Sequence, residues 1–395
     1  MPVHLSDLKN RSAALLDGMV SIRRHLHRNP EVSYQEHDTT TFILEELKKL
    51  GIPTERPLET GCVGVIEGKK PGPVIALRAD IDALAMDEEG DVKRDFMSRR
   101  PGAAHCCGHD AHTSNLIGAA SLLTEFSEHL EGKVVLIFQP AEEKLPGGGR
   151  LLCETGYLQK AGVEAIYGLH TSPYHKTGTV AFREGPLMAR PDEFEIELVG
   201  KGGHAAYPHM AIDPIVMASA TVMQLQTVVS RSVDPAEPAV VTVGKIGAGS
   251  AHNVIPAKAN LLGTVRTFSK ETANQIRERM EQIVSGVARA HGGEYRFQFN
   301  EGYPAVVNDS NLSEKFRKTA SDLMGDKAVI EMAKPVMAGE DFAFYQQHFP
   351  GLFFFLGSGS EESDSQWSWH HPRYNVDENC FLVGAPLLAS LALNI

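Results

Sequence analysis

The spacing of apolar residues predicts alternating helices and strands in the first part of the chain. Residues 8–26 and 38–50 repeat apolar positions with the period of an α-helix. Residues 73–77 and 134–138 are short apolar runs typical of buried strands, and residues 110–123 again have helical spacing. Such alternation predicts an α/β core with a mixed, largely parallel sheet. Ligand sites in these sheets lie at the carboxyl ends of the strands.

The pattern changes character near Met188. Residues 194–198 alternate apolar and charged side chains, as a half-exposed strand does. The next segments predict a helix, two strands, a helix and a strand at residues 214–229, 240–243, 261–267, 272–291 and 294–299. This order is typical of an α+β split-βαβ unit.

The first pattern then resumes. Residues 311–324 have helical spacing, residues 352–356 are a buried strand, and the chain closes on a helix. These last segments are too few to form a core of their own. We therefore predict one domain from residues 1–188 and 303–395, with residues 189–302 inserted as a second domain.

Composition restricts the class of function. The chain has 395 residues, of which 42% are hydrophobic and 22% charged, and a net charge of −12 without a basic block, which argues against nucleic-acid binding. Residues 1–20 contain no uninterrupted apolar core, and the longest apolar stretch, 381–395, is too short to span a bilayer. Five cysteines argue against a disulfide framework. We expect a cytoplasmic protein without membrane contact.

Residues 105–112 concentrate metal-binding chemistry, with three histidines, two cysteines and one aspartate. Cys107 and His109 lie two positions apart, and Gly108 between them permits a bend that favours chelation. Although a lone cysteine or histidine is usually structural, this cluster with His112 favours a metal site. We expect Asp110 to orient an imidazole as a hydrogen-bond partner, whereas Cys106 is most simply packed.

A pair of acids, Glu142 and Glu143, follows the predicted strand at 134–138. An acid pair is commonly a solvated surface, but beside a buried strand two adjacent carboxylates repel unless a cation lies near them. We expect one to coordinate and the other to accept a proton from metal-bound water. His170 ends the apolar run 166–169, again at a predicted strand end. His370 and His371 supply a late imidazole pair before a proline.

Seven motifs, in one order along the chain, carry a resemblance to a known family. They are Ala79-Asp80-Ile81-Asp82-Ala83-Leu84, His105-x-Cys107-Gly108-His109-Asp110-x-His112, Gln139-Pro140-Ala141-Glu142-Glu143, Gly202-Gly203-His204-Ala205-Ala206, Asn253-Val254-Ile255-Pro256, Gly263-Thr264-Val265-Arg266-Thr267 and Gly339-Glu340-Asp341-Phe342. From about Arg23 to its last helix, the chain resembles the N-acyl-amino-acid amidohydrolases. This metallopeptidase-like group contains hippurate hydrolase, N-acetyldiaminopimelate deacetylase and the plant auxin-conjugate hydrolases.

The resemblance implies metal-dependent hydrolysis of the amide bond of N-acyl amino acids, and it assigns roles by position. It implies two divalent ions held by Cys107, His109, Glu143, His170 and His370, with Glu142 as the general base. His204 matches a histidine of the smaller domain that, in related dimers, reaches the partner's active site and stabilises the oxyanion. Asn253 and Arg266 match positions that hold the substrate's carboxylate. The inserted domain is thereby expected to act in lid closure or dimerisation, and the chain to form a homodimer or a higher homo-oligomer.

The sequence departs from the family pattern at two positions, Cys106 where alanine is usual and Ala85 where proline is common. Neither change removes a donor. Either His370 or His371 could coordinate, and alignment on Pro372 favours His370. The ligand set accommodates manganese, zinc, cobalt or nickel.

Two alternatives remain open from the sequence. A metallo-aminopeptidase or carboxypeptidase acting on unblocked dipeptides could use the same ligands. A non-catalytic metal-binding protein would have a closed site, without an acid beside the ligands.

Overall fold

The computed structural model describes residues 4–393, so that residues 1–3 and 394–395, at the ends of the predicted first domain and last helix, lie outside the described part. The chain forms two compact units. The first comprises Met1–Leu187, Val307–Pro335 and Asp341–Ile395, and the second comprises Met188–Val306 and Val336–Glu340. The sequence predicted domain boundaries at 188/189 and 302/303. It did not indicate that the short segment Val336–Glu340 belongs to the second unit.

The first unit is built on an eight-stranded sheet with the order β1-β2-β4-β3-β5-β16-β6-β15. Its strands are β1 (Thr54–Glu55), β2 (Cys62–Glu67), β3 (Lys70–Asp80), β4 (Glu131–Gln139), β5 (Ala165–Lys176), β6 (Val180–Phe182), β15 (Val329–Glu331) and β16 (Gly351–Gly359). The four central strands β4, β3, β5 and β16 run parallel, and β1, β2 and β6 add antiparallel pairings. The predicted α/β class with a mixed, largely parallel sheet is confirmed.

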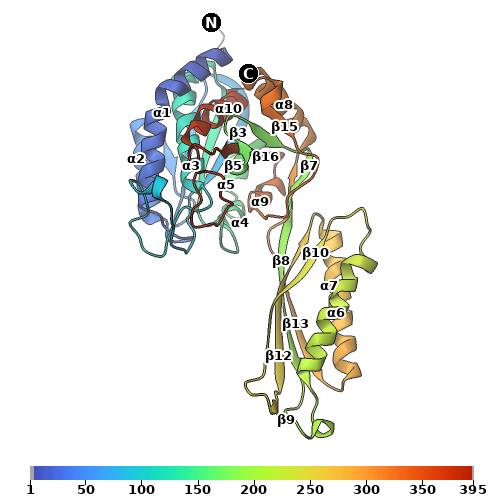
Figure 1. Ribbon diagram of the computed structural model, residues 1–395. Helices are drawn as coiled ribbons and strands as arrows, with labels where there is room; N and C mark the ends of the chain where they lie inside the picture. Colours follow the sequence, from blue (N-terminus) through green and yellow to red (C-terminus); the bar gives the residue numbers. More distant parts are fainter. Residues whose placement is uncertain (1–3, 394–395) are drawn as a thin grey trace. The chain divides into compact units, whose positions relative to one another are not determined.

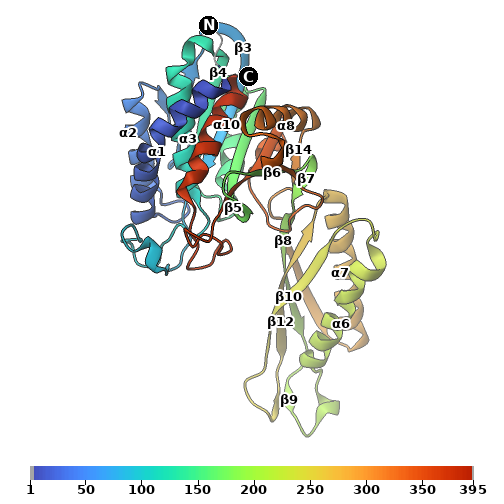
Figure 2. The ribbon, with the colours of Figure 1, turned by 45° about the horizontal axis from the view of Figure 1, so that its top comes forward.

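Helices cover this sheet. They are α1 (Leu5–Arg28), α2 (His37–Lys49), α3 (His109–Glu125), α4 (Gly148–Glu154), α5 (Tyr157–Ala161), α8 (Ser310–Met324), α9 (Ala343–Gln346) and α10 (Phe381–Leu393). Helices α1, α3 and α10 pack against one another on one face of the sheet, as Figures 1 and 2 show. Side chains of alternate strand positions such as Leu77, Leu136 and Tyr167 meet these helices in the main core. Helix α3 is buried on nearly all sides because it lies between the sheet, α1 and α10.

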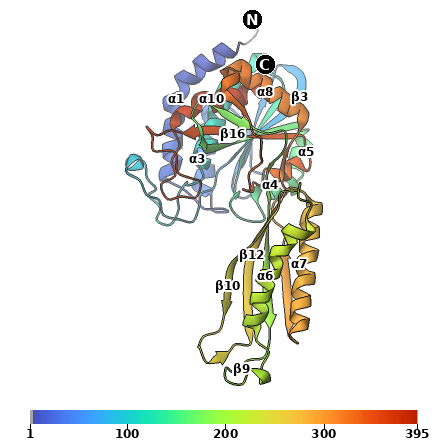
Figure 3. The ribbon, with the colours of Figure 1, turned by 45° about the vertical axis from the view of Figure 1, so that its right-hand side comes forward.

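The second unit is a four-stranded antiparallel sheet with two helices on one face, visible in Figure 3. Its elements are β8 (Arg190–Val199), β9 (Gly203–His204), α6 (Pro214–Ser232), β10 (Val240–Ala248), β11 (Val254–Ile255), β12 (Lys258–Thr267), α7 (Lys270–Ala290) and β13 (Glu294–Asn300). The sheet order is β10-β12-β8-β13. Inward residues of β8, including Phe194, Ile196 and Leu198, pack against α6 and α7. Apart from β9 and β11, which pair in a separate two-stranded sheet, the succession of strand, helix, two strands, helix and strand is the one that the sequence pattern predicted.

The remaining elements are short. Strands β7 (Gly185–Met188) and β14 (Val306–Asn308) lie where the chain passes from one unit to the other, and 3-10 turns occur at Asp91–Lys93, Ser127–His129, Pro208–Met210, Asp326–Ala328 and Glu378–Cys380. All five cysteines are buried free thiols, in agreement with the prediction that the chain has no disulfide framework. No helix formed by residues 4–393 is both long and apolar enough to cross a bilayer.

Candidate metal centre

Side chains that can bind metals gather at one edge of the first unit's sheet. Strand β3 ends at Asp80, β4 ends at Gln139, and these two residues are partners in the parallel ladder. Helix α3 begins beside them at His109. Gly108, directly before it, has a φ of +96°, and a Cβ there would lie 2.4 Å from Thr171 Oγ1. A glycine is therefore required where this turn approaches β5.

We call a set of side chains whose ligand atoms lie close enough to bind one metal ion a donor group. The first donor group consists of Cys107, His109 and His170. Their ligand atoms all lie within 4.8 Å of one another, and Cys107 Sγ is 3.3 Å from His170 Nε2. His170 Nδ1 lies 2.8 Å from the carbonyl oxygen of Thr171. Because a carbonyl can only accept, Nδ1 carries the proton and Nε2 presents its lone pair to the thiol.

The predicted position of His170 at the end of a strand is wrong. Strand β5 continues to Lys176, because Thr171, Ser172 and Lys176 pair with β16. His170 nevertheless lies past the last pairing of β5 with β3, at Gly168. Its side chain can therefore reach the edge at which β3 ends.

Cys107, Glu143 and His370 form a second donor group, which shares its thiol with the first. His370 Nε2 is 3.3 Å from Glu143 Oε1. The backbone of His370 is left-handed, with a φ of +63°, and its N–H donates to the carbonyl of Cys106 at 2.8 Å. His371 instead stacks on Trp367, with ring centroids 4.5 Å apart. The structure thus brings all five predicted ligands into two overlapping groups, with His370 rather than His371 among them.

Glu142 joins a third group with His109 and Glu143. The Glu142 side chain is buried. The backbone N–H groups of Glu142 and Glu143 donate to Asp82 Oδ1 and Oδ2 at 3.1 and 3.0 Å. One aspartate therefore anchors the backbone of both acids.

Asp82, rather than Asp110, orients the imidazole of a candidate ligand, His109. Asp82 Oδ1 lies 3.2 Å from His109 Nδ1, so that His109 Nε2 is directed toward the donor groups. Asp110 was expected in this role, and that prediction is wrong. Its carboxylate binds His27 at 2.7 Å and Arg23 at 3.2 Å, because its position in the first turn of α3 turns it toward α1.

His112 could join Asp80 and His109 in a further donor group, but its ring nitrogens already have partners within the protein. Its Nδ1 lies 2.6 Å from Asp80 Oδ1, and its Nε2 accepts from the backbone N–H of Thr171 at 2.8 Å. Both ring nitrogens are thereby engaged. The sequence placed His112 in the metal-binding cluster. In the structure, its hydrogen bonds join Thr171 of β5 to Asp80 at the end of β3.

The chemistry of the donor set fits a cation. His109 Nε2 is buried without a hydrogen-bond partner among residues 4–393, and the buried Glu143 Oε1 has His370 Nε2 at 3.3 Å. Burial, with the charges of Glu143 and Glu142, raises the pKa of the Cys107 thiol well above its usual value. Burial opposes the charging of His109, but Asp80 and Asp82 outweigh it and raise its pKa to about 10. An incoming ion would displace these protons, as metal ions do at thiolate and imidazole sites.

The other three predicted site residues belong to the second unit. His204 in β9 is the ladder partner of Val254 in β11, and Ala205 N–H donates to the carbonyl of Asn253 at 3.1 Å, so His204 and Asn253 are neighbours. Arg266 lies near the far end of β12, where its ladder partners are Val240 and Pro191. The structure therefore brings together two of these residues and separates the third from them.

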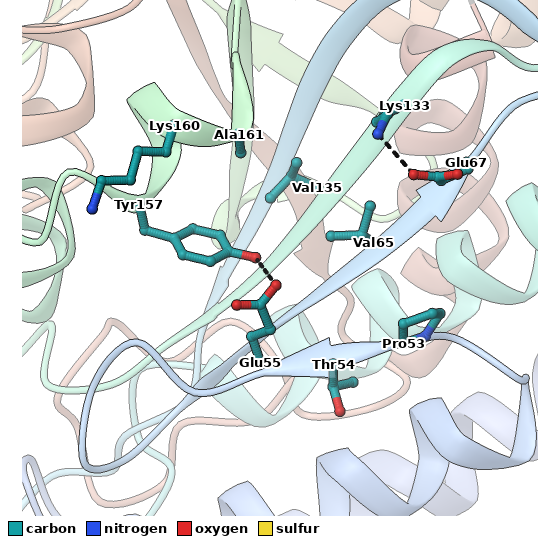
Figure 4. Close-up of a pocket in the computed structure, with 10 residues that line it drawn as sticks. All are labelled: Pro53, Thr54, Glu55, Val65, Glu67, Lys133, Val135, Tyr157, Lys160 and Ala161. Carbon is teal, nitrogen blue, oxygen red and sulfur yellow. Dashed lines mark hydrogen bonds and ion pairs between the residues drawn. The ribbon is translucent and has the colours of Figure 1, made fainter.

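A surface groove of about 630 Å³ lies elsewhere in the first unit, and Figure 4 shows its lining. It is lined by Pro53, Thr54, Glu55, Val65, Glu67, Lys133, Val135, Tyr157, Lys160 and Ala161. Its polar groups largely satisfy one another, since Tyr157 donates to Glu55 at 3.1 Å and Lys133 to Glu67 at 2.7 Å. None of the candidate residues lines this groove, so its size does not make it the reactive site.

Known proteins resemble this chain over nearly its whole length. It is 42% identical to N-acetyl-L-cysteine deacetylase of Bacillus subtilis (strain 168), over 96% of this chain and 87% of the relative. It is 38% identical to Thermostable carboxypeptidase 2 of Saccharolobus solfataricus, over 98% and 97%. The crystal structure of the Bacillus subtilis YXEP protein, called a dinuclear metal binding peptidase from M20 family, matches with a TM-score of 0.84 at 37% identity, over 97% and 98%.

The profile of the family described as "Peptidase family M20/M25/M40" matches residues 76–394, a span that includes both donor groups. The resemblance carried by the seven sequence motifs is confirmed by this match and by the deacetylase relative. The chain belongs to the peptidase family M20/M25/M40.

Proposed function

We propose that this enzyme, a metal-dependent amidohydrolase, removes the acyl group from N-acyl amino acids and releases a carboxylic acid and a free amino acid. The observation that carries the proposal is the pair of donor groups that share Cys107, with Glu142 beside them. The deacetylase and dinuclear-peptidase relatives support the same reading.

Cys107, His109, Glu143, His170 and His370 would hold two divalent ions. A thiol, imidazoles and a carboxylate suit zinc, manganese, cobalt or nickel. Such ions supply Lewis acidity and lower the pKa of a coordinated water from about 15.7 to about 7.

Glu142 is the proposed general base. It would accept a proton from the attacking water and return that proton to the leaving amine nitrogen. Its backbone is fixed by Asp82, which also orients His109, so that base and ligand keep a set spacing. A base held in this way needs little reorganisation during the reaction.

The test of this role is Glu142→Gln, compared with Glu143→Gln. We expect Glu142→Gln to fold and to bind two ions while kcat falls by roughly 10²–10⁴-fold, the usual contribution of a general base. Glu143→Gln should lose metal as well as activity. Wild-type turnover in metal-loaded Glu142→Gln would rule out this assignment.

Deacylation competes with peptide cleavage as the reaction, because one relative is named a carboxypeptidase. The proposal assigns the free carboxylate of the substrate to Asn253 and Arg266, since a guanidinium donates two parallel hydrogen bonds to a carboxylate. The two reactions separate when kcat/KM is measured on N-acetyl and N-benzoyl amino acids and on unblocked dipeptides. A preference for the dipeptides would replace deacylation by peptidase activity.

We further infer that the enzyme works as a homodimer, with His204 acting in the active site of the partner. The support comes from spacing within the second unit. His204 and Asn253 adjoin the start of β12, and Arg266 lies eight positions along that strand from Lys258. At about 3.3 Å per strand residue, this separation is roughly 26 Å. One small substrate can contact all three residues only if they come from two subunits.

Mixing two inactive variants tests the dimer. In the proposed dimer, each active site takes Glu142 from one subunit and His204 from the other. Glu142→Gln and His204→Ala therefore each remove one of these two groups. Equal mixing with subunit exchange should restore about one quarter of wild-type turnover, because half of the dimers are mixed and each contains one intact site. A mixture no more active than its components would exclude action of His204 across subunits. A cytoplasmic location stays a prediction from the sequence.

A further inference from the structure

The loop that follows β4 holds Glu142 and Glu143 on an unusual backbone. Ala141, directly before Glu142, has a φ of +53°, in the left-handed region that residues with a side chain seldom adopt. Such a conformation persists only where surrounding contacts hold it. The direction in which Glu142 leaves the backbone depends on this residue.

Both backbone polar groups of Ala141 are bound. Its N–H donates to Glu36 Oε1 at 2.8 Å, and its carbonyl accepts from the N–H of Gly148 at 3.0 Å. The Glu36 side chain is fully buried, and its other oxygen accepts from Thr60 Oγ1 at 2.9 Å. Glu36 thus contacts the one residue of the loop other than glycine that has a positive φ.

Neighbours of Glu36 in the sequence hold the same region. Tyr34, itself left-handed with a φ of +68°, donates its hydroxyl to the carbonyl of Lys144 at 3.0 Å and accepts from Gly147 N–H at 3.2 Å. Ser33 Oγ donates at 2.7 Å to Asp82, the aspartate that anchors the backbone of Glu142 and Glu143. We call residues 33–36 the brace. The brace therefore contacts the start of the loop at Ala141 and its end at Lys144 and Gly147. It also contacts Asp82, which anchors the backbone of the loop.

We propose that Glu36 is a positioning residue for Glu142: its hydrogen bond to Ala141 N–H stabilises the left-handed backbone that directs the Glu142 carboxylate toward the donor groups. The inference rests on the proposed role of Glu142 as the base. Displacing a reacting group by about 1 Å can reduce turnover by roughly 100-fold. Glu36 therefore acts on turnover without touching substrate or metal.

The contact requires an acceptor and not a charge. Burial, together with the charge of Asp82, raises the pKa of Glu36 to about 7, so the surroundings do not favour its ionised form. A glutamine carbonyl could accept from Ala141 N–H, and its amide could donate to the Thr60 hydroxyl, which can also act as an acceptor. Glu36→Gln should consequently keep the loop in place, whereas Glu36→Leu removes the acceptor.

The experiment compares Glu36→Leu, Glu36→Gln and, as a matched control, Thr60→Val, which removes the hydrogen bond that Glu36 Oε2 accepts from Thr60. For each variant, we would measure kcat and KM on an N-acetyl amino acid, the metal content, and amide hydrogen exchange in residues 140–147. We expect Glu36→Leu to lower kcat by about 10–100-fold with two ions bound and KM unchanged, and to speed exchange in 140–147. Glu36→Gln and Thr60→Val should stay within about threefold of wild type.

Three results would overturn the proposal. They are wild-type kcat in Glu36→Leu, an equal loss in Glu36→Gln, and a loss of turnover in Glu36→Leu that only follows its loss of metal. If Glu36→Leu does not fold, Tyr34→Phe decides, because it removes the hydroxyl contacts at the half-buried end of the brace. It should lower kcat by several-fold and speed exchange in 140–147, and no change in either quantity would contradict the brace.

Hydrogen exchange separates this inference from the proposed function. If Glu142→Gln keeps full turnover, the base is wrongly assigned. Faster exchange of 140–147 in Glu36→Leu, but not in Glu36→Gln, would then still support the contact with Ala141. Unchanged exchange in a folded Glu36→Leu variant contradicts the contact whatever the role of Glu142.

Discussion

The two donor groups are built in different ways. His109 and His170 belong to a helix and a strand and are buried, at 0% and 6% exposure. Glu143 and His370 belong to loops, and the His370 side chain is 54% exposed. The fold itself presents the first pair, whereas added hydrogen bonds must fix the second. Cys107 is common to both groups.

The loop donors have separate supports. Asp82 and the brace hold the Glu142–Glu143 backbone, as described above. On the other side, Lys93 Nζ donates to the carbonyls of Tyr374 and Pro372 at 2.9 and 3.3 Å, beyond His370. Lys93 is itself paired with Glu88 at 2.6 Å, and both side chains are buried. A buried ion pair thus holds the loop that presents His370, the most exposed of the candidate ligands.

The largest effect is expected at the shared donor. Cys107→Ser should abolish tight binding of both ions, because it removes a ligand from each group. Loss of an outer partner of a ligand already costs about 10–100-fold in affinity, so a shared ligand should cost more than about 100-fold. Cys106→Ala, one position away, is the control and should keep both ions. The number of ions retained per chain is measured by metal analysis after dialysis. An equal loss of metal in Cys107→Ser and Cys106→Ala would contradict the assignment of the shared thiol to Cys107.

A smaller and one-sided effect is expected at the loop. His370→Asn should weaken one ion and leave the other on Cys107, His109 and His170. His371→Asn should keep both, since His371 stacks on Trp367 and accepts from Arg373 N–H. Calorimetric titration of metal-free variants distinguishes these cases. Loss of both ions in His370→Asn would mean that the groups are not independent.

The smallest effect concerns acid stability of the loop support. Burial opposes the charge on Glu88, but His27 and Lys93 lower its pKa to about 2. Because the folded pKa is depressed, the stabilisation is present above the unfolded value of about 4.3 and is lost as pH falls toward 2. As the pH falls from about 4.3 to about 2, the free energy of unfolding of the wild type should therefore decrease by about 2 kcal/mol more than that of Glu88→Gln.

Urea unfolding of the metal-free protein, followed by the fluorescence of Trp367 and Trp369 in the first unit, measures the difference between the two proteins. Parallel stability curves for wild type and Glu88→Gln between pH 5 and pH 2 would contradict the depressed pKa.

The regular elements could be predicted from the sequence because apolar periodicity records which face is buried. The second unit is the clearest case, since buried residues of β8 alternate with half-buried or exposed ones along its length. Part of the donor groups could also be anticipated, because Cys107 and His109 stand in a dense cluster and Glu142 and Glu143 follow a buried strand. Metal-binding residue types that lie close together in the sequence can be recognised without knowledge of the tertiary contacts.

The supports could not be predicted in the same way. Asp82 was missed as an orienting residue because the apolar run ends at Leu77, whereas β3 continues to Asp80 and places Asp82 just beyond the sheet. Asp110 was misassigned because its direction depends on how α3 packs against α1. The contact between Glu36 and Ala141 joins residues 105 positions apart through a left-handed backbone, and neither feature leaves a periodic pattern.

The sharing of the Cys107 thiol by two overlapping donor groups is the feature on which the proposed metal centre depends. Its most direct test is a titration of the metal-free wild-type protein and of Cys107→Ser with Mn²⁺ or Zn²⁺, counting tightly bound ions per chain. We expect two ions for the wild type and none for Cys107→Ser. Two tightly bound ions in Cys107→Ser, or only one in the wild type, would contradict it.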